Sequence, residues 1–124
     1  MNKRANSFLK KGIENLVDAN EELFRPEEDI VTYSVCKNSQ YAIENYLKGY
    51  LLKNNVEIGE LKTISLLLEQ CILINANFKK LDFSDIDCKL SEIDSRYCNS
   101  IDKVKSCFDV ADNLDTFLRQ EKII

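Results

Sequence analysis

The stretch that decides the fold is Cys36–Leu52, CKNSQYAIENYLKGYLL. Around it, small and apolar residues recur at offsets of three and four, the spacing that places side chains on one face of an α-helix. This face comprises Val35, Cys36, Ser39, Ala42, Ile43, Tyr46, Leu47, Tyr50 and Leu51. The opposite side carries Lys37, Tyr41, Glu44 and Lys48, and the last two have the spacing of a helical ion pair. The stretch predicts the middle of one long amphipathic helix.

The same periodicity predicts helices on either side of this stretch. The long helix itself should run from Pro26 or Glu27 to Asn54, because proline suits the first turn of a helix. Further helices are expected over about 4–24, 64–77 and 100–120, with a short one beginning near Ser84. Thr63 and Ser100 are suitable N-caps for two of them.

Length and composition favour an all-α fold. The chain has 124 residues, with only three glycines and one proline to mark turns. A β-sandwich or barrel would need many more turn signals. We therefore predict a single domain over residues 1–124, an up-and-down antiparallel bundle of four main helices plus one short helix. Gly12, inside the first helix, indicates a close approach between two helices.

Charge and hydropathy indicate a soluble, cytoplasmic protein. The net charge of −4 predicts no strong field for nucleic acid, and we expect no DNA partner. The first residues, Met1 to Leu9, contain no apolar run of the signal-peptide type, and no apolar stretch is long enough to span a bilayer.

The helix over 64–77 is apolar nearly all round, which predicts a homodimer through an apolar helix face.

Cysteine and histidine counts exclude several kinds of site. The cysteines are odd in number, without zinc-type spacing, and read as free thiols: Cys36, Cys71, Cys88, Cys98 and Cys107. The sequence contains no histidine, so Ser-His-Asp and Cys-His catalysis and histidine-ligated metals are excluded. The acidic residues between Asp82 and Asp94 read as caps and a solvated face. We expect no metal and no cofactor.

Three short segments resemble the HEPN family of small helical domains. Gln40-x-Ala42-x-Glu44-x-x-Leu47-Lys48 is similar to the family's Gln-Ala-x-Glu-Lys-x-Leu-Lys helix. Lys62–Leu66 stands where the family has Thr-His followed by leucine, and Ile93–Tyr97 resembles its Arg-Tyr-Pro segment. Their order and spacing agree with the family from about residue 5 to 120. The resemblance implies the helical fold and the homodimer.

The chain departs from the family where the family's chemistry lies. Many HEPN proteins are similar to metal-independent ribonucleases that use an Arg, a few polar residues and a His, supplied by both subunits of the dimer. Here Arg96 is present, but the positions where the histidine would fall are Ile101, Asp102 and Lys103. Ile64 replaces the family's other common histidine, and Cys98 replaces its proline. The resemblance therefore does not carry over the ribonuclease activity.

The candidate ligand-binding residues are Arg96, Tyr97, Asp94, Glu44 and Lys48. An arginine can bind phosphate in bidentate fashion and a tyrosine ring can stack on a base. The alternative is structural, with Arg96 paired to Asp94 or Glu92 and Tyr97 packed in the core. Glu44 and Lys48 either line a cleft with Arg96 or form an exposed ion pair of little consequence. No catalytic residue is predicted.

Three hypotheses about function follow. The first is a non-catalytic HEPN domain that binds a nucleotide, RNA, or a partner protein such as a minimal nucleotidyltransferase, in a toxin–antitoxin-like pair. The second is a ribonuclease with a degenerate active site built on Arg96, helped by Tyr97 or Asp102. No side chain present titrates near neutrality in its unperturbed state, which counts against this one. The third is a purely structural dimerisation module.

Overall fold

The computed structural model describes residues 3–59, 61, 63–81 and 101–124, and within these ranges the chain is all-α. Its α-helices are α1 (Lys3–Leu23), α2 (Thr32–Lys53), α3 (Ile64–Ile74) and α4 (Ile101–Gln120). Two short 3-10 helices, η1 (Glu27–Asp29) and η2 (Ala76–Lys80), follow α1 and α3. The prediction of an all-α bundle with four main helices is confirmed. The predicted short helix near Ser84 lies outside the described residues.

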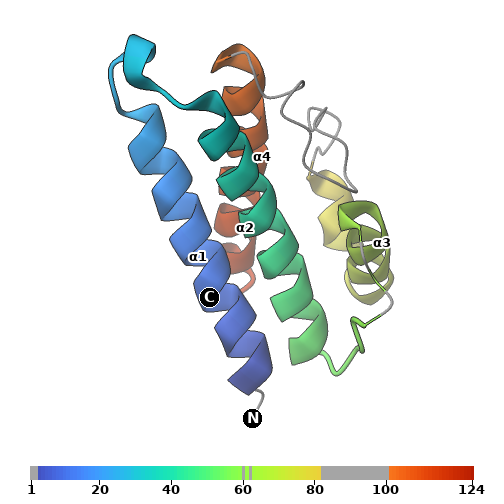
Figure 1. The fold of residues 1–124 in the computed structure, drawn as a ribbon. Helices are drawn as coiled ribbons and strands as arrows, with labels where there is room; N and C mark the ends of the chain where they lie inside the picture. Colours follow the sequence, from blue (N-terminus) through green and yellow to red (C-terminus); the bar gives the residue numbers. More distant parts are fainter. Residues whose placement is uncertain (1–2, 60, 62, 82–100) are drawn as a thin grey trace.

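The helix α2 is the centre of the bundle, as its sequence predicts. It packs against α1, α3 and α4, and α1 and α2 run side by side over most of their length (Figure 1). The predicted inner face is buried in full, and Tyr46, Leu47 and Leu51 are completely inaccessible. Tyr41, on the predicted polar side, is 41% exposed. Most of the α2 side chains in the core therefore come from the Cys36–Leu52 stretch.

Two glycines allow α1 and α2 to pack closely. A Cβ atom on Gly12 would lie 2.7 Å from Cδ1 of Tyr46, and one on Gly49 would lie 2.6 Å from Cγ of Leu9. Both distances are shorter than carbon atoms tolerate without movement. The prediction of close helix approach at Gly12 is confirmed, and the Tyr46 ring is the group that needs the space.

The start of α2 differs from the prediction. Pro26 is followed only by the 3-10 turn η1, and α2 begins six residues later at Thr32. Val31 is extended, with φ −88° and ψ 95°, and its N–H donates to Oε2 of Glu22 at 3.0 Å. The first turn of α2 contains no acidic residue of its own. The Glu22 carboxylate, from the end of α1, instead accepts the hydrogen bond of the amide that precedes α2. The acids after Pro26 therefore belong to η1.

The end of α3 also differs. Thr63 is its N-cap as predicted, with the Leu66 N–H donating to Oγ1 at 3.1 Å. The helix stops at Ile74 instead of continuing to Asn77, because Asn75 is extended and its side chain caps η2. This break lets Phe78 enter the core, where its ring packs edge-on against Tyr50 and Phe117 at 4.8 Å. Phe78 is fully buried, although the sequence placed it in a connection.

Candidate functional site

Of the five candidate ligand-binding residues, the structure describes Glu44 and Lys48. Arg96, Tyr97 and Asp94 lie outside the described residues, so their placement stays a prediction. Glu44 and Lys48 form the expected ion pair, with Nζ to Oε1 at 2.9 Å. Both side chains are partly buried, which distinguishes this pair from a fully solvated one.

The pair lies in a cleft of about 350 Å³ formed by the start of α1, the second half of α2 and the connection that follows α2. We call it the Lys48 cleft, and its lining residues are Arg4, Phe8, Glu44, Lys48, Ile58, Gly59 and Leu61. The Phe8 ring holds two cations: Cζ of Arg4 lies 6.0 Å from the ring centroid and Nζ of Lys48 lies 5.7 Å from it. Cation–π contacts at exposed sites contribute about 0.5–1 kcal/mol each, which favours positions of both cations near the ring. Glu44 and Lys48 therefore line a cleft, and a contribution of Arg96 to it stays a prediction.

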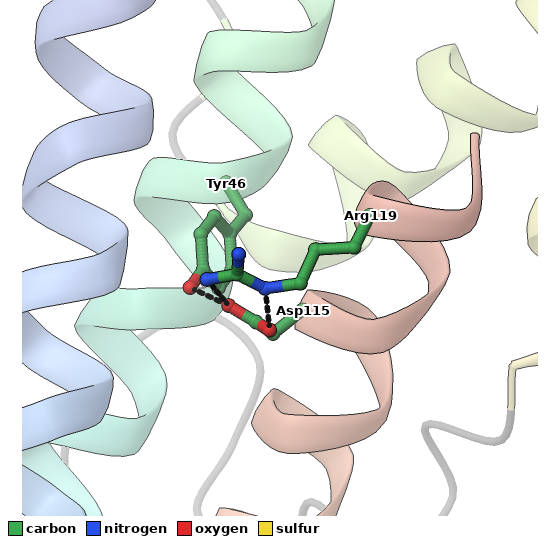
Figure 2. Close-up of polar contacts among 3 residues, drawn as sticks. All are labelled: Tyr46, Asp115 and Arg119. Carbon is green, nitrogen blue, oxygen red and sulfur yellow. Dashed lines mark hydrogen bonds and ion pairs between the residues drawn. The ribbon is translucent and has the colours of Figure 1, made fainter. Parts of the chain in front are cut away.

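A second polar cluster joins α2 to α4 and was not predicted. Figure 2 shows Tyr46 reaching from α2 toward Asp115 on α4, with the Arg119 side chain directed to the same carboxylate. The Tyr46 hydroxyl donates to Oδ2 of Asp115 at 2.5 Å, and Arg119 Nε donates to Oδ1 at 2.6 Å. A second Arg119 nitrogen, Nη2, donates to Oδ2 at 3.4 Å. Both oxygens of a nearly buried carboxylate are therefore satisfied.

This cluster fits a structural role better than a catalytic one. Tyr46 is fully buried, and burial, followed by its bond to Asp115, raises the pKa of its hydroxyl well above the ordinary value. Such a group keeps its proton near neutral pH and does not meet solvent, so it is a poor general acid or base. Asp115 raises the pKa of Arg119 further, which holds the guanidinium as a cation. The cluster joins two helices and completes the hydrogen bonding of a core tyrosine.

Sequence signals for the cluster existed. Asp115 lies four residues after Ala111, which is buried in α4, and four before Arg119. A buried tyrosine needs a partner for its hydroxyl. Together these patterns predict a carboxylate that points into the bundle. A search for apolar residues at helical spacing does not find it.

A smaller cleft of about 220 Å³ lies between α1 and α4. It is lined by Leu16, Val17, Asn20, Phe108 and Asp112. Partial burial, with the nearby Asp115 and Asp109, raises the pKa of Asp112. The described lining of this cleft has one charged group and no cation, so it offers less for binding than the Lys48 cleft.

The cysteines partly depart from the expected set of free thiols. Cys71 and Cys107 are buried thiols, whereas Cys36 is disulfide-bonded, so the expectation of a free thiol is wrong for Cys36. Burial raises the pKa of the Cys71 thiol to about 12, which keeps it protonated and unreactive. Within the described ranges no three Cys, Asp or Glu side chains converge to hold a metal ion. The helices of the same ranges are too short or too polar to cross a membrane.

Comparison with known proteins gives one family and no individual relative. No curated protein and no solved structure matches the chain. The family model described as HEPN domain matches residues 5–119, nearly the whole sequence. This range includes all three segments that carry the resemblance, as well as α2 and α3 in full and most of α1 and α4. The protein therefore belongs to the HEPN domain family.

Proposed function

We propose that this HEPN domain works by binding a nucleotide or RNA and does not cleave it. The observation that carries the proposal is the absence of histidine from the whole sequence. Metal-independent cleavage of RNA needs a group that gives and takes a proton near neutral pH, and histidine is the side chain suited to this. The buried Tyr46 and Cys71 cannot replace it, because burial moves the pKa of each further above neutrality.

The same proposal makes the protein a homodimer through the outer face of α3. Leu66, Leu73 and Ile74 are exposed on this helix, and Leu73 is 78% exposed. These residues are spaced by seven and eight, which puts them on one stripe. Burying such a stripe between two copies would remove apolar surface from water, a favourable change of about 25 cal/mol per Å². A minimal nucleotidyltransferase is the alternative occupant of this surface and would co-purify from the native cell.

The ligand contact that we propose is Arg96, assisted by Tyr97 and Asp94. Fluorescence polarisation with labelled single-stranded RNA tests it on the whole protein. We expect Arg96→Ala to weaken binding about tenfold, the range for loss of a charged hydrogen bond. The matched control is Arg25→Ala, which removes an exposed arginine that pairs only loosely with Glu22 at 3.7 Å. Equal binding by the wild type and both variants would show that Arg96 is not the contact, and no binding by any of them would support the purely structural module instead.

A ribonuclease with a degenerate site is the remaining alternative. It would use Arg96 with Tyr97 or Asp102, and it predicts cleavage of structured RNA that is lost in Arg96→Ala. Our proposal predicts binding without cleavage. A denaturing gel of RNA incubated with the protein separates the two.

A further inference from the structure

The Lys48 cleft has a positive lining in an acidic protein. Among the described residues that line it, the charged ones are Arg4, Lys48 and Glu44, so cations outnumber anions, whereas the whole chain carries a net charge of −4. Both cations lie within 6.0 Å of the centre of the Phe8 ring, so they flank one point of the cleft. Two cations around one point favour an anionic ligand.

The two cations differ in how far they are already paired with other groups of the protein. Lys48 is paired with Glu44 at 2.9 Å, but an ammonium has two further N–H donors. Arg4 touches the Phe8 ring and forms no ion pair or hydrogen bond with any residue in the described part of the chain. The first turn of α1, where Arg4 lies, contains no acidic residue. Arg4 and Lys48 therefore still have N–H donors for a second anion, in addition to the Glu44 carboxylate.

The uncharged residues of the described lining are mainly apolar and limit the size of the ligand. Ile58 is buried, Leu61 packs against the core, and the Phe8 ring lies beside both cations. At about 350 Å³ the cleft lies near the lower end of the range of about 300–1,000 Å³ for small-molecule sites. It fits one small organic group with an anionic end better than a strand of nucleic acid.

We propose that the Lys48 cleft binds a small phosphate monoester. Its phosphate lies between Arg4 and Lys48, and its organic part lies against Ile58 and Leu61. Phosphate is preferred over carboxylate because the ligand must compete with Glu44 for Lys48. A phosphate monoester carries a charge of about −1.5 to −2 at neutral pH, against −1 for the Glu44 carboxylate. This rests on the proposed function and deepens it by adding a ligand site that does not involve Arg96.

Isothermal titration calorimetry on the whole protein tests the proposal, with phenyl phosphate, benzoate, phenol and inorganic phosphate as probes. We expect phenyl phosphate to bind tightest, because it alone combines the dianion with an apolar body. Lys48→Gln should weaken its binding about tenfold or more, and Glu44→Gln should strengthen it, because each changes the charge that faces the phosphate. Equal binding of benzoate, or of inorganic phosphate alone, would overturn the proposal.

The matched control is Lys37→Gln. Lys37 lies on the same helix and its Nζ lies 5.8 Å from the Tyr33 ring centroid, so it repeats the Lys48–Phe8 contact away from the cleft. Lys37→Gln should leave phenyl phosphate binding unchanged, and a loss equal to that of Lys48→Gln would overturn the site. Failure here is distinct from failure of the proposed function: an RNA-binding protein whose affinity for phenyl phosphate ignores Lys48 refutes only the cleft. A protein that binds phenyl phosphate through Lys48 but binds no RNA refutes only the nucleic-acid proposal.

Discussion

The Tyr46 hydroxyl donates to the Asp115 carboxylate at 2.5 Å, across the interface between α2 and α4. The other edge of the same tyrosine ring fills the space that Gly12 leaves on α1. This side chain of α2 thus contacts both other long helices of the bundle, α1 and α4. The stability of the fold should depend on it more than on any exposed ion pair.

Tyr46→Phe should destabilise the protein by about 1–3 kcal/mol, because it removes a donor from a nearly buried carboxylate. Urea unfolding followed by circular dichroism measures the change. The control is Tyr41→Phe, at a position 41% exposed on the same helix, where surface substitutions usually stay within about 0.5 kcal/mol. If the two variants unfold at the same urea concentration, the bond to Asp115 contributes nothing to stability.

Gly12→Ala should also destabilise, although alanine is the better helix former by about 1 kcal/mol. The new Cβ would lie 2.7 Å from the Tyr46 ring, which is held at its other end by Asp115. Overpacking a core typically costs about 1–3 kcal/mol and should exceed the gain in propensity. Gly59→Ala is the control, because no atom lies within 4 Å of the place that its new methyl group would take. A Gly12→Ala variant more stable than wild type would contradict the close contact.

Stability should fall at alkaline pH. The folded protein raises the pKa of Cys71 from 9.0 to about 12 and that of Tyr46 above its ordinary 10.0, so the unfolded chain loses these protons first. The native state then binds more protons than the unfolded state, and the free energy of unfolding decreases as pH rises. The stabilisation is complete below pH 9 and is lost progressively above it. Urea unfolding at about pH 8 and about pH 11 should differ, and Tyr46→Phe should reduce that difference; a flat profile would contradict both shifts.

The dimer prediction concerns Leu73, which is 78% exposed on α3. Leu73→Asp should convert the dimer to a monomer in light scattering, because it places a charge in the proposed apolar contact. Phe24→Asp is the matched control: Phe24 is 81% exposed but follows the end of α1. A wild-type protein that is monomeric at micromolar concentration would show the interpretation of α3 to be wrong.

Sequence patterns predicted most of the fold and little of the site. The period of three and four identified α1, α2, α3 and α4, and the Thr63 cap fixed where α3 begins. The start of α2 was misplaced because the Glu22 bond to Val31 is a tertiary contact between segments nine residues apart. Phe78 was missed because a 3-10 turn has no clear apolar period.

The candidate site shows the same limit. Glu44 and Lys48 were found because helical spacing reveals ion pairs directly. Arg4, Phe8 and Ile58 were missed, because only the packing of α1 on α2 and the path of the next connection bring them to Lys48. Lining residues that come from three separate segments form no local pattern in the sequence, and the contacts of Arg4 and Lys48 with the Phe8 ring exist only in the folded chain.

The most direct test of the central claim is incubation of the purified protein in excess with end-labelled structured RNA, followed by both a native and a denaturing gel. We predict a shifted complex on the native gel and full-length RNA on the denaturing gel, with Arg96→Ala reducing the shift. Cleaved RNA whose appearance depends on Arg96 would contradict the claim and restore the ribonuclease interpretation.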